Sequence, residues 1–488
     1  MNSFKCKVIL IGLLLTLVIA VPVLAQTIKD ADDGTTLKQV IIFGRHGIRS
    51  SAIEPSTLAQ FAANPYPPFV NPYPPFAEVP TGYLTPHGQE AARLLGSYFH
   101  DYLLHEGLLT GSAPTDLSRS YFRANSIQRS NVTAAMFGAG LIPGATIPVH
   151  SYTITDPDTG TPAEPDPVFD PIAAKVVRVV DPGRAETEVQ GIFGSGAALA
   201  SAYSSELSLI RSVLYPPGTK PTFPPGAQPA PGAPPEPPGS FDPTSIPFTL
   251  AAYTPVTNAG GSINLGGLNF TNSATDPFVM QYADGFPPED VAWDRLLPDT
   301  LSQTTRLITL QINIEMRLPY VNQVQSSNAA SHVLRSMSQA IVGCQLPGAF
   351  GNGKSRVLVI ISSDYYVAGL AGLLRLHWTL PGYQPDYCAP GGALVFELRQ
   401  SKKSKEYLVR AFYTAQTFDQ LRKLTPLTLE EPPATMQLTI PGGSNSATDL
   451  DVKFVTFQKL LSEAICQKYV QPFWKEDQPG VLDNVPLD

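Results

Sequence analysis

The chain has 488 residues, of which 43% are hydrophobic, and carries a formal net charge of −8. This length corresponds to roughly two or three domains, so a large apolar core can form. The acidic balance argues against nucleic acid and anionic membranes as partners, because both repel a negative protein. An anionic substrate would have to be bound by a local cluster of cations.

The first 25 residues resemble a secretory signal peptide. Lys5 and Lys7 precede an apolar run over residues 8–24, and Val23-Leu24-Ala25 is a small-residue cleavage pattern. An uncleaved anchor is the alternative, since the run approaches the length that spans a bilayer. We expect residues 1–25 to be removed, which leaves a periplasmic or secreted protein with no membrane contact.

Cleavage would leave three cysteines, Cys344, Cys388 and Cys466. An odd number allows at most one intramolecular disulfide here. We expect one bridge and one buried thiol, with the pairing open. No spacing among the three resembles a zinc site.

Residues 36–150 carry alternating strand and helix signals. The β-branched apolar run at 38–43 is typical of a buried strand, which stops at Gly44. Thr85-Pro86 is typical of a helix start, and Gly107 of its end. The sequence Asn-Pro-Tyr-Pro-Pro-Phe occurs at 64–69 and again at 71–76, and its prolines predict a surface loop.

A second helix is expected from residue 127 towards residue 139, with Asn125-Ser126 as its cap. Residues 151–330 then differ in character and are interpreted as an insertion. They include the proline-rich segment 216–247, which predicts an extended excursion.

Residues 331–488 return to the earlier pattern. The run at 356–361 predicts a second buried strand, followed by Ser363-Asp364 and a helix over 367–376. Residues 392–398 and 407–413 predict a hairpin. Residues 36–150 and 331–488 together therefore predict an α/β core.

Two polar clusters follow the predicted buried strands, one at Arg45-His46 and one at Ser363-Asp364. Ligands of open α/β sheets bind beyond the carboxyl ends of the strands. Both clusters are therefore expected to face the same crevice.

The segment Arg45-His46-Gly47-Ile48-Arg49 suits phosphoryl transfer. Guanidinium groups bind phosphate oxygens bidentately, and a neutral imidazole can attack phosphorus and form a phosphohistidine. Arg129 falls in the first turn of a predicted helix, where free amides also favour an anion. Asp364 is the candidate proton donor, which implies an acidic optimum. A surface Arg-His cluster, a solvated helix arginine and a structural aspartate are the alternatives.

These residues resemble the histidine acid phosphatases, and among them the bacterial periplasmic phytases and glucose-1-phosphatases. The resemblance covers most of the mature chain outside the proline-rich segment. Its motifs are Arg-His-Gly-Ile-Arg at 45–49, Leu-Thr-Pro-His-Gly at 84–88, residues 125–140, Trp-Thr-Leu-Pro-Gly at 378–382, residues 390–397 and Leu-Thr-Pro-Leu at 424–427, with weaker similarity over 280–295.

The resemblance implies a three-layer α/β core, with a mixed, mostly parallel sheet covered by helices on both faces. It also implies a smaller, mostly helical cap formed by the insertion, and a cleft between the two. It assigns His46 as nucleophile, Asp364 as general acid, and Arg45, Arg49 and Arg129 as the phosphate clamp. No metal or other cofactor is implied.

The chain departs from the family at Ser363, where the family has a histidine that contacts phosphate. Serine can bind phosphate by a hydrogen bond but carries no charge. Loss of one preorganised donor typically costs on the order of 100-fold in rate. Tyr365-Tyr366 and Ser50-Ser51 depart from the family as well.

The leading interpretation is an exported phosphatase that acts on a small phosphate monoester, such as phytate or a sugar phosphate. A catalytically weakened homologue that binds a phosphorylated or anionic ligand is the alternative. A cofactor-independent mutase shares the Arg-His-Gly chemistry, but the signal peptide and C-terminal motifs argue against it. Asp276 is a further candidate contributor from the insertion.

Overall fold

The computed structural model describes residues 33–59, 62–72, 77–152, 165–219, 267–471 and 478–480. The expected signal peptide lies outside the described residues, as do nearly all of the proline-rich segment 216–247 and most of the second Asn-Pro-Tyr-Pro-Pro-Phe sequence.

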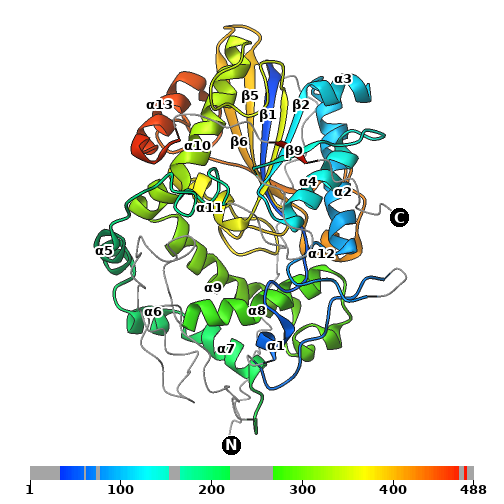
Figure 1. Cartoon of the computed structure of the whole chain (residues 1–488), viewed down its shortest axis with the longest axis vertical. Coiled ribbons are helices and arrows are strands. Elements are labelled where there is room, and N and C mark those ends of the chain that lie inside the picture. The colour runs from blue at the N-terminus through cyan, green and yellow to red at the C-terminus, as the bar shows by residue number, and fades with distance from the viewer. Residues whose placement is uncertain are drawn as a thin grey trace, which may run out of the picture.

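A mixed β-sheet forms the centre of the molecule (Figure 1). Its strand order is β7-β6-β5-β1-β4-β2-β3-β9, and β8 pairs with β6. Strands β1, β4, β2 and β3 pair in parallel, and antiparallel strands extend the sheet on either side. The strands are β1 (Thr35–Arg45), β2 (Ser120–Ala124), β3 (Val149–Ser151), β4 (Val357–Ser362), β5 (Ala393–Ser401), β6 (Tyr407–Ala415), β7 (Ala434–Gln437), β8 (Val452–Lys453) and β9 (Gln478–Gly480).

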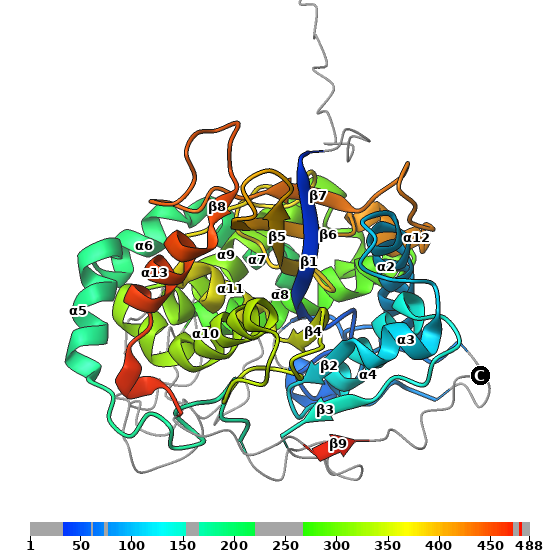
Figure 2. The ribbon, with the colours of Figure 1, turned by 90° about the horizontal axis from the view of Figure 1, so that it is seen from above.

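Side-chain alternation along the buried strands explains why helices cover both faces of the sheet. Val40 and Ile42 of β1 pack into one apolar cluster with helices α2 and α4, whereas Ile41 and Phe43 pack into another with α10, α11 and α13. Figure 2 shows the two helical layers on opposite sides of the strands. These helices are α2 (Pro86–His105), α4 (Gln128–Leu141), α10 (Pro319–Val342), α11 (Asp364–Leu373) and α13 (Phe454–Ala464). The expected α/β fold is confirmed.

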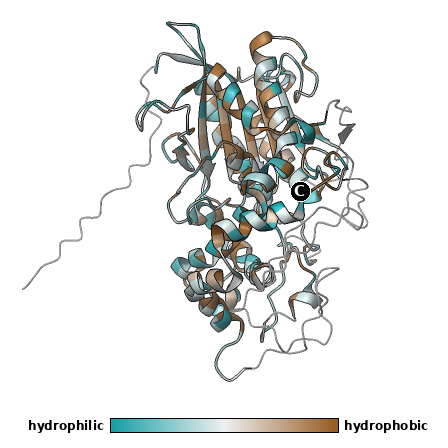
Figure 3. Ribbon diagram, turned by 90° about the vertical axis from the view of Figure 1, so that its left-hand side faces the viewer, coloured by the Kyte–Doolittle hydropathy of each residue, from teal (hydrophilic) through white to brown (hydrophobic). Residues whose placement is uncertain are grey.

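A mostly helical region lies beyond the carboxyl ends of β1 and β4 (Figures 1 and 3). It contains α5 (Pro182–Phe193), α6 (Gly196–Ala202), α7 (Ser204–Leu214), α8 (Gly267–Ala283) and α9 (Pro298–Met316). Its division from the core stays a prediction, and the expected boundary at 330/331 falls inside the continuous helix α10. Shorter elements are α1 (Pro55–Leu58), α3 (Ala113–Ser118), α12 (Phe418–Lys423), η1 (Pro288–Asp290), η2 (Ala292–Asp294) and η3 (Gln467–Tyr469).

The expected disulfide is wrong, because all three cysteines considered for it are free. The backbone N–H of Cys466 donates to Ser327 Oγ, partway along α10 (2.9 Å), whereas Cys344 follows the far end of that helix. The helical rise places the two about 25 Å apart, and a bridge needs Cα atoms within about 7 Å. Cys388 is the buried thiol.

Two local predictions also need correction. Asn125-Ser126 does not cap α4, since the N-cap is Ile127 and makes no side-chain cap hydrogen bond. Helix α11 starts at Asp364 rather than at residue 367. The other predicted helix start is confirmed, because Thr85 caps α2 by accepting a hydrogen bond from the N–H of Gly88 (2.9 Å).

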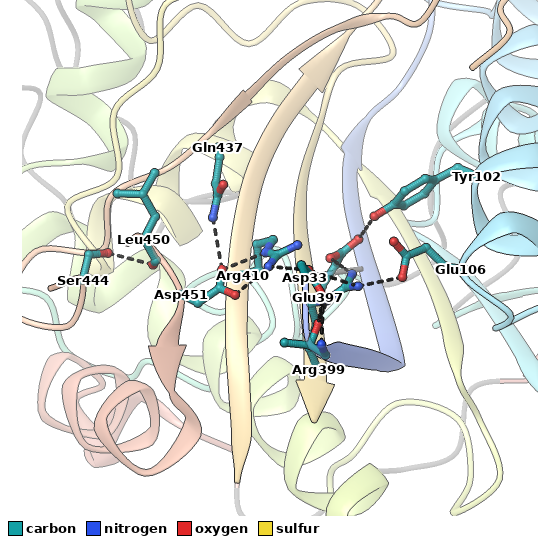
Figure 4. A network of polar contacts seen from close by, with 11 residues as sticks. Asp33, Tyr102, Glu106, Glu397, Arg399, Arg410, Gln437, Ser444, Leu450 and Asp451 are labelled. Atoms are coloured by element: carbon teal, nitrogen blue, oxygen red, sulfur yellow. Dashed lines mark hydrogen bonds and ion pairs between the residues drawn. The ribbon is translucent and has the colours of Figure 1, made fainter. Parts of the chain in front are cut away.

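An ion-pair network joins the ends of β5 and β6 that lie away from the carboxyl end of β1 (Figure 4). Arg399 contacts Glu397 and Glu106, both at 2.7 Å. Arg410 contacts Asp451 at 2.7 Å and Asp33 at 2.8 Å. Asp33 thereby fixes the start of the described chain to the sheet.

Three buried or half-buried carboxyl groups predict that the protein is most stable in mild acid. Burial raises the pKa of Glu315 and Asp284 to about 7 and that of Asp170 to about 6. Groups with a raised folded-state pKa contribute stability below their unfolded pKa, near 4, and this contribution is lost as pH rises towards 7. We expect the melting temperature to fall between pH 5 and pH 8. The upper limit is about 3–4 kcal/mol for each group.

Thermal unfolding followed by circular dichroism across this pH range measures the effect. Glu315→Gln should flatten the pH dependence, because the amide carries no charge at any of these pH values. A melting temperature that rises from pH 5 to pH 8 would contradict the prediction.

Candidate active site

The two predicted polar clusters lie side by side at the carboxyl ends of β1 and β4. Arg45 is in register with Ser362 of β4. The backbone N–H of His46 donates to the Ser362 carbonyl (2.7 Å), and the His46 carbonyl accepts from the N–H of Gly391 (3.0 Å). The parallel pairing therefore brings residues 45–49 next to residues 363–364, as expected.

Arg45 is fully buried and has three kinds of contact. Its Nη1 donates to the Cys388 carbonyl at 2.7 Å, while its Nη2 lies 3.1 Å from Asp364 Oδ2 and 3.8 Å from Asp276 Oδ1. Burial opposes its positive charge, but Asp364, Tyr387 and Asp276 raise the pKa of Arg45 above its ordinary value. The guanidinium is therefore permanently charged and fixed in orientation.

His46 is buried and held in one tautomer. Its Nδ1 lies 2.9 Å from the carbonyl oxygen of Gly47, so a neutral ring donates through Nδ1–H and keeps its lone pair on Nε2. Burial lowers the pKa of His46 well below its usual value, and the charges of Arg129, Arg45 and Arg49 lower it further. The ring thus stays an uncharged potential nucleophile in mild acid.

Arg49 and Arg129 complete a group of three guanidiniums around His46. Arg49 Nη2 lies 3.0 Å from Asp276 Oδ2, and Arg129 Nη1 donates to the Gly82 carbonyl at 3.3 Å. Burial and the neighbouring Arg49 lower the pKa of Arg129 to about 9, so it keeps its charge in acid. The buried Nε atoms of Arg45, Arg49 and Arg129 have no hydrogen-bond acceptor among the described residues. Such donors suit an anion with several oxygens.

Helix α4 is hydrogen-bonded to the loop that contains His46 (residues 46–49). The N–H of Gly47 donates to Thr133 Oγ1 (3.0 Å), and the Thr133 hydroxyl donates to the Arg129 carbonyl (2.6 Å). On the other side of the loop, a Cβ at Gly88 would lie 2.2 Å from the Ile48 carbonyl oxygen. Only glycine at the start of α2 allows that approach.

Asp364 and Ser363 lie at the start of α11. Asp364 contacts Arg45, and its Oδ1 accepts a hydrogen bond from the N–H of Tyr365 (3.2 Å). Ser363 is the N-cap but makes no side-chain cap hydrogen bond. The predicted proton donor therefore sits beside the guanidinium group, whereas the serine hydroxyl is not committed to the helix.

Asp276 of α8 contributes more than its sequence context indicated. It bridges Arg45 and Arg49 and so occupies the arginines that could bind a phosphate. An oxyanion that uses the Nη2 atoms of both guanidiniums competes with this carboxylate.

Removing the Asp276 charge should strengthen anion binding. We expect Asp276→Asn to lower the dissociation constant for inorganic phosphate by about tenfold, since a partly buried ion pair no longer competes. Isothermal titration calorimetry measures this dissociation constant. Asp419→Asn, which removes an exposed carboxylate paired with Lys423 on α12, is the matched control and should change nothing. Weaker phosphate binding by Asp276→Asn would show that the carboxylate supports the site instead.

Tyr387, which the sequence did not predict, is buried beside Arg45. Its only signal in the sequence was its place ahead of the 390–397 motif.

The described residues contain no group of three or more His, Cys, Asp or Glu side chains that could hold a metal ion. The described helices include none long and apolar enough to cross a membrane.

No protein-family model matches the chain. It is 26% identical over 467 residues to Phytase AppA of Escherichia coli, covering 94% of this chain and 98% of that protein. It is 25% identical over 455 residues to a Glucose-1-phosphatase of Providencia rettgeri, covering 91% of this chain and 95% of that one. The solved apo form of Hafnia alvei phytase superposes with a TM-score of 0.75 at 27% identity, covering 91% of this chain and 100% of that chain.

The homologues are thus a phytase and glucose-1-phosphatases, and the structural neighbours are bacterial phytases, which are histidine acid phosphatases. The resemblance predicted from the sequence motifs is confirmed.

Proposed function

We propose that the chain is an exported acid phosphatase that hydrolyses phosphate monoesters through a phosphohistidine at His46. The observation that carries the proposal is the His46 ring, which is neutral and held by Gly47 within three guanidiniums. The phytase and glucose-1-phosphatase homologues support a phosphatase that acts on phosphate monoesters. Phytate and a sugar phosphate are therefore the substrates to test first.

The first half of the proposed reaction forms the covalent intermediate. The phosphoryl group displaces Asp276 and binds to Arg45, Arg49 and Arg129, which neutralise its charge. The Nε2 lone pair of His46 attacks phosphorus, and the bond to the ester oxygen breaks. Protonated Asp364 gives its proton to the departing alkoxide.

The second half restores the enzyme. Ionised Asp364 removes a proton from water, which attacks phosphorus and breaks the P–N bond. Inorganic phosphate leaves, His46 is again neutral and Asp364 is again protonated, so protons and charge balance over the cycle.

Ser363 favours a second candidate, a weakened homologue that binds a phosphorylated ligand with the same arginines. The Ser363 side chain is shorter than the histidine that the family has at this position, and its hydroxyl carries no charge. Restoring that donor by Ser363→His should raise turnover by up to about 100-fold.

The two candidates are separated by assaying the purified protein with p-nitrophenyl phosphate between about pH 4 and pH 6, where carboxylic acids can still carry a proton. Turnover by the wild type supports the phosphatase. Absent turnover that appears on Ser363→His supports a weakened site. If neither protein turns over but inorganic phosphate binds and Arg129→Ala weakens it, the binding function is favoured.

Export has its own test, because residues 1–25 are proposed to be cleaved before Gln26. Mass spectrometry of the protein from a periplasmic or culture fraction should give a chain that starts at Gln26. A full-length chain recovered with the membranes would contradict export in this form.

A further inference from the structure

The first Asn-Pro-Tyr-Pro-Pro-Phe segment, residues 64–69, lies against helix α8 and the residues that follow it. It forms neither helix nor strand, as its prolines predict. Four of its residues nevertheless contact side chains of α8 or of residues 286–295. These contacts are Arg295 Nη2 to Asn64 Oδ1 (2.8 Å), Trp293 Nε1 to the Pro65 carbonyl (2.8 Å), Gln281 Nε2 to the Pro67 carbonyl (3.1 Å) and the Phe69 ring to the Phe286 ring (4.9 Å between centroids). The segment is therefore fixed against α8.

Tyr66, in the middle of this segment, contacts α8 on both sides of Asp276. Its hydroxyl donates to the carbonyl of Ala274 at 2.9 Å, and its ring stacks on that of Phe278 with centroids 5.4 Å apart. The Trp293 ring packs edge-on against the rings of both Tyr66 and Phe278. Residues 274 and 278 are four apart and share one face of the helix, so Asp276 between them lies on the opposite face. From that face its carboxylate reaches the arginines of the site.

Asp276 occupies a backbone position of α8 that needs support from outside the helix. The next residue, Pro277, lies inside the helix. Proline has no N–H for the carbonyl four residues earlier, and its ring disfavours the helical conformation of the residue before it, which is Asp276. Contacts with other segments must therefore help to keep residues 274–278 helical. Tyr66 supplies one such contact through the backbone of Ala274 and another through the ring of Phe278.

We propose that Tyr66 is a positioning residue for Asp276, which braces α8 on either side of that carboxylate and so limits how tightly the site binds phosphate. Asp276 lies 3.0 Å from Arg49 Nη2 and 3.8 Å from Arg45 Nη2. Because an aspartate side chain is short, both contacts depend on where the backbone of α8 holds residue 276. The inference rests on the proposed function for the identity of the competing anion, but it concerns phosphate affinity rather than turnover.

Tyr66→Phe removes the hydroxyl and keeps the stacked ring. We expect inorganic phosphate to bind about threefold to fivefold more tightly, because losing one hydrogen bond loosens residues 274–278 and weakens the competing carboxylate. Isothermal titration calorimetry measures the affinity. Tyr383→Phe is the matched control, since its buried hydroxyl also donates to a main-chain carbonyl, that of Gln416 (2.6 Å). The control should lose stability but keep phosphate affinity within about twofold of the wild type.

An Asp276→Asn background provides a readout that a purely structural role of Tyr66 would not change. Once residue 276 carries no charge, its position no longer matters to the arginines, so Tyr66→Phe should leave phosphate affinity unchanged in that background. The fall in melting temperature caused by the lost hydrogen bond should be the same in both backgrounds. Unchanged or weaker phosphate binding by Tyr66→Phe alone, or an equal gain in both backgrounds, would overturn the proposal.

Turnover of p-nitrophenyl phosphate separates a failure of this inference from a failure of the proposed function. If the wild type does not turn over, the phosphatase fails, yet a gain in phosphate affinity that depends on Asp276 still supports the inference. If the wild type turns over and Tyr66→Phe binds phosphate as the wild type does, only the inference falls.

A second variant serves if Tyr66→Phe does not fold. Trp293→Phe removes the hydrogen bond to the Pro65 carbonyl, which holds the residue before Tyr66. It should tighten phosphate binding by about twofold to threefold, again only while residue 276 is an aspartate. The absence of that gain would equally overturn the proposal.

Discussion

Replacing His46 by alanine is expected to reduce turnover of a phosphate monoester by roughly four orders of magnitude or more, because the nucleophile of a covalent mechanism is removed outright. The His46→Ala variant should still bind phosphate. Arg45, Arg49 and Arg129 are held by contacts that do not involve the imidazole ring, with Asp364, Asp276 and the Gly82 carbonyl among their partners. Initial rates with p-nitrophenyl phosphate, measured alongside phosphate titrations, test both halves of this expectation.

The matched control is His105→Ala, which removes an exposed imidazole in the last turn of α2. It should leave the rate unchanged. A His46→Ala protein that retains more than a few per cent of the wild-type rate would mean that another group attacks phosphorus, or that water attacks directly.

The second large effect is expected for Arg45→Lys. The guanidinium contacts the Cys388 carbonyl through Nη1 and Asp364 through Nη2. A lysine keeps the charge but presents one compact ammonium group, which cannot reproduce this planar geometry. We expect kcat/KM to fall by about 100-fold, the usual effect of losing a preorganised donor.

Arg356→Lys is the control for the chemical change. Arg356 immediately precedes β4, and its Nη1 donates to the carbonyls of Gly353 and Ser355 (3.1 Å each). The strand separates it from the site by about 20 Å. The Arg356→Lys variant should lose a little stability and no activity. If Arg45→Lys were as active as the wild type, charge alone would explain phosphate binding, and the argument from geometry would be wrong.

The core of the site could be predicted because its residues follow two buried strands. The apolar runs at 38–43 and 356–361 indicated two buried strands whose carboxyl ends face the same crevice. The structure pairs them in parallel, which puts Arg45 opposite Ser362. Arg129 falls in the first turn of α4 as predicted, although the cap expected at Asn125-Ser126 is not the one that the helix has. Strand alternation likewise accounts for the helices on both faces.

The remaining features depend on contacts between segments far apart in the chain. Asp276 stands 227 positions after Arg49, and nothing in the intervening sequence indicates that α8 places it across two arginines. Tyr387 lies near Arg45 because the adjoining Cys388 carbonyl accepts a hydrogen bond from Arg45, a contact between residues 343 positions apart. The disulfide prediction failed for the same reason, since cysteine number does not reveal that α10 keeps Cys344 and Cys466 apart.

Trapping the covalent intermediate tests the central claim most directly. Wild-type protein is mixed with a phosphate monoester at acidic pH, quenched within the first turnovers into an alkaline denaturant that preserves phosphohistidine, and digested for mass spectrometry. We predict a phosphoryl group on the peptide that contains His46, which disappears when substrate is exhausted and never forms in His46→Ala. Steady turnover by the wild type with no phosphorylated His46 at any quench time would contradict the mechanism.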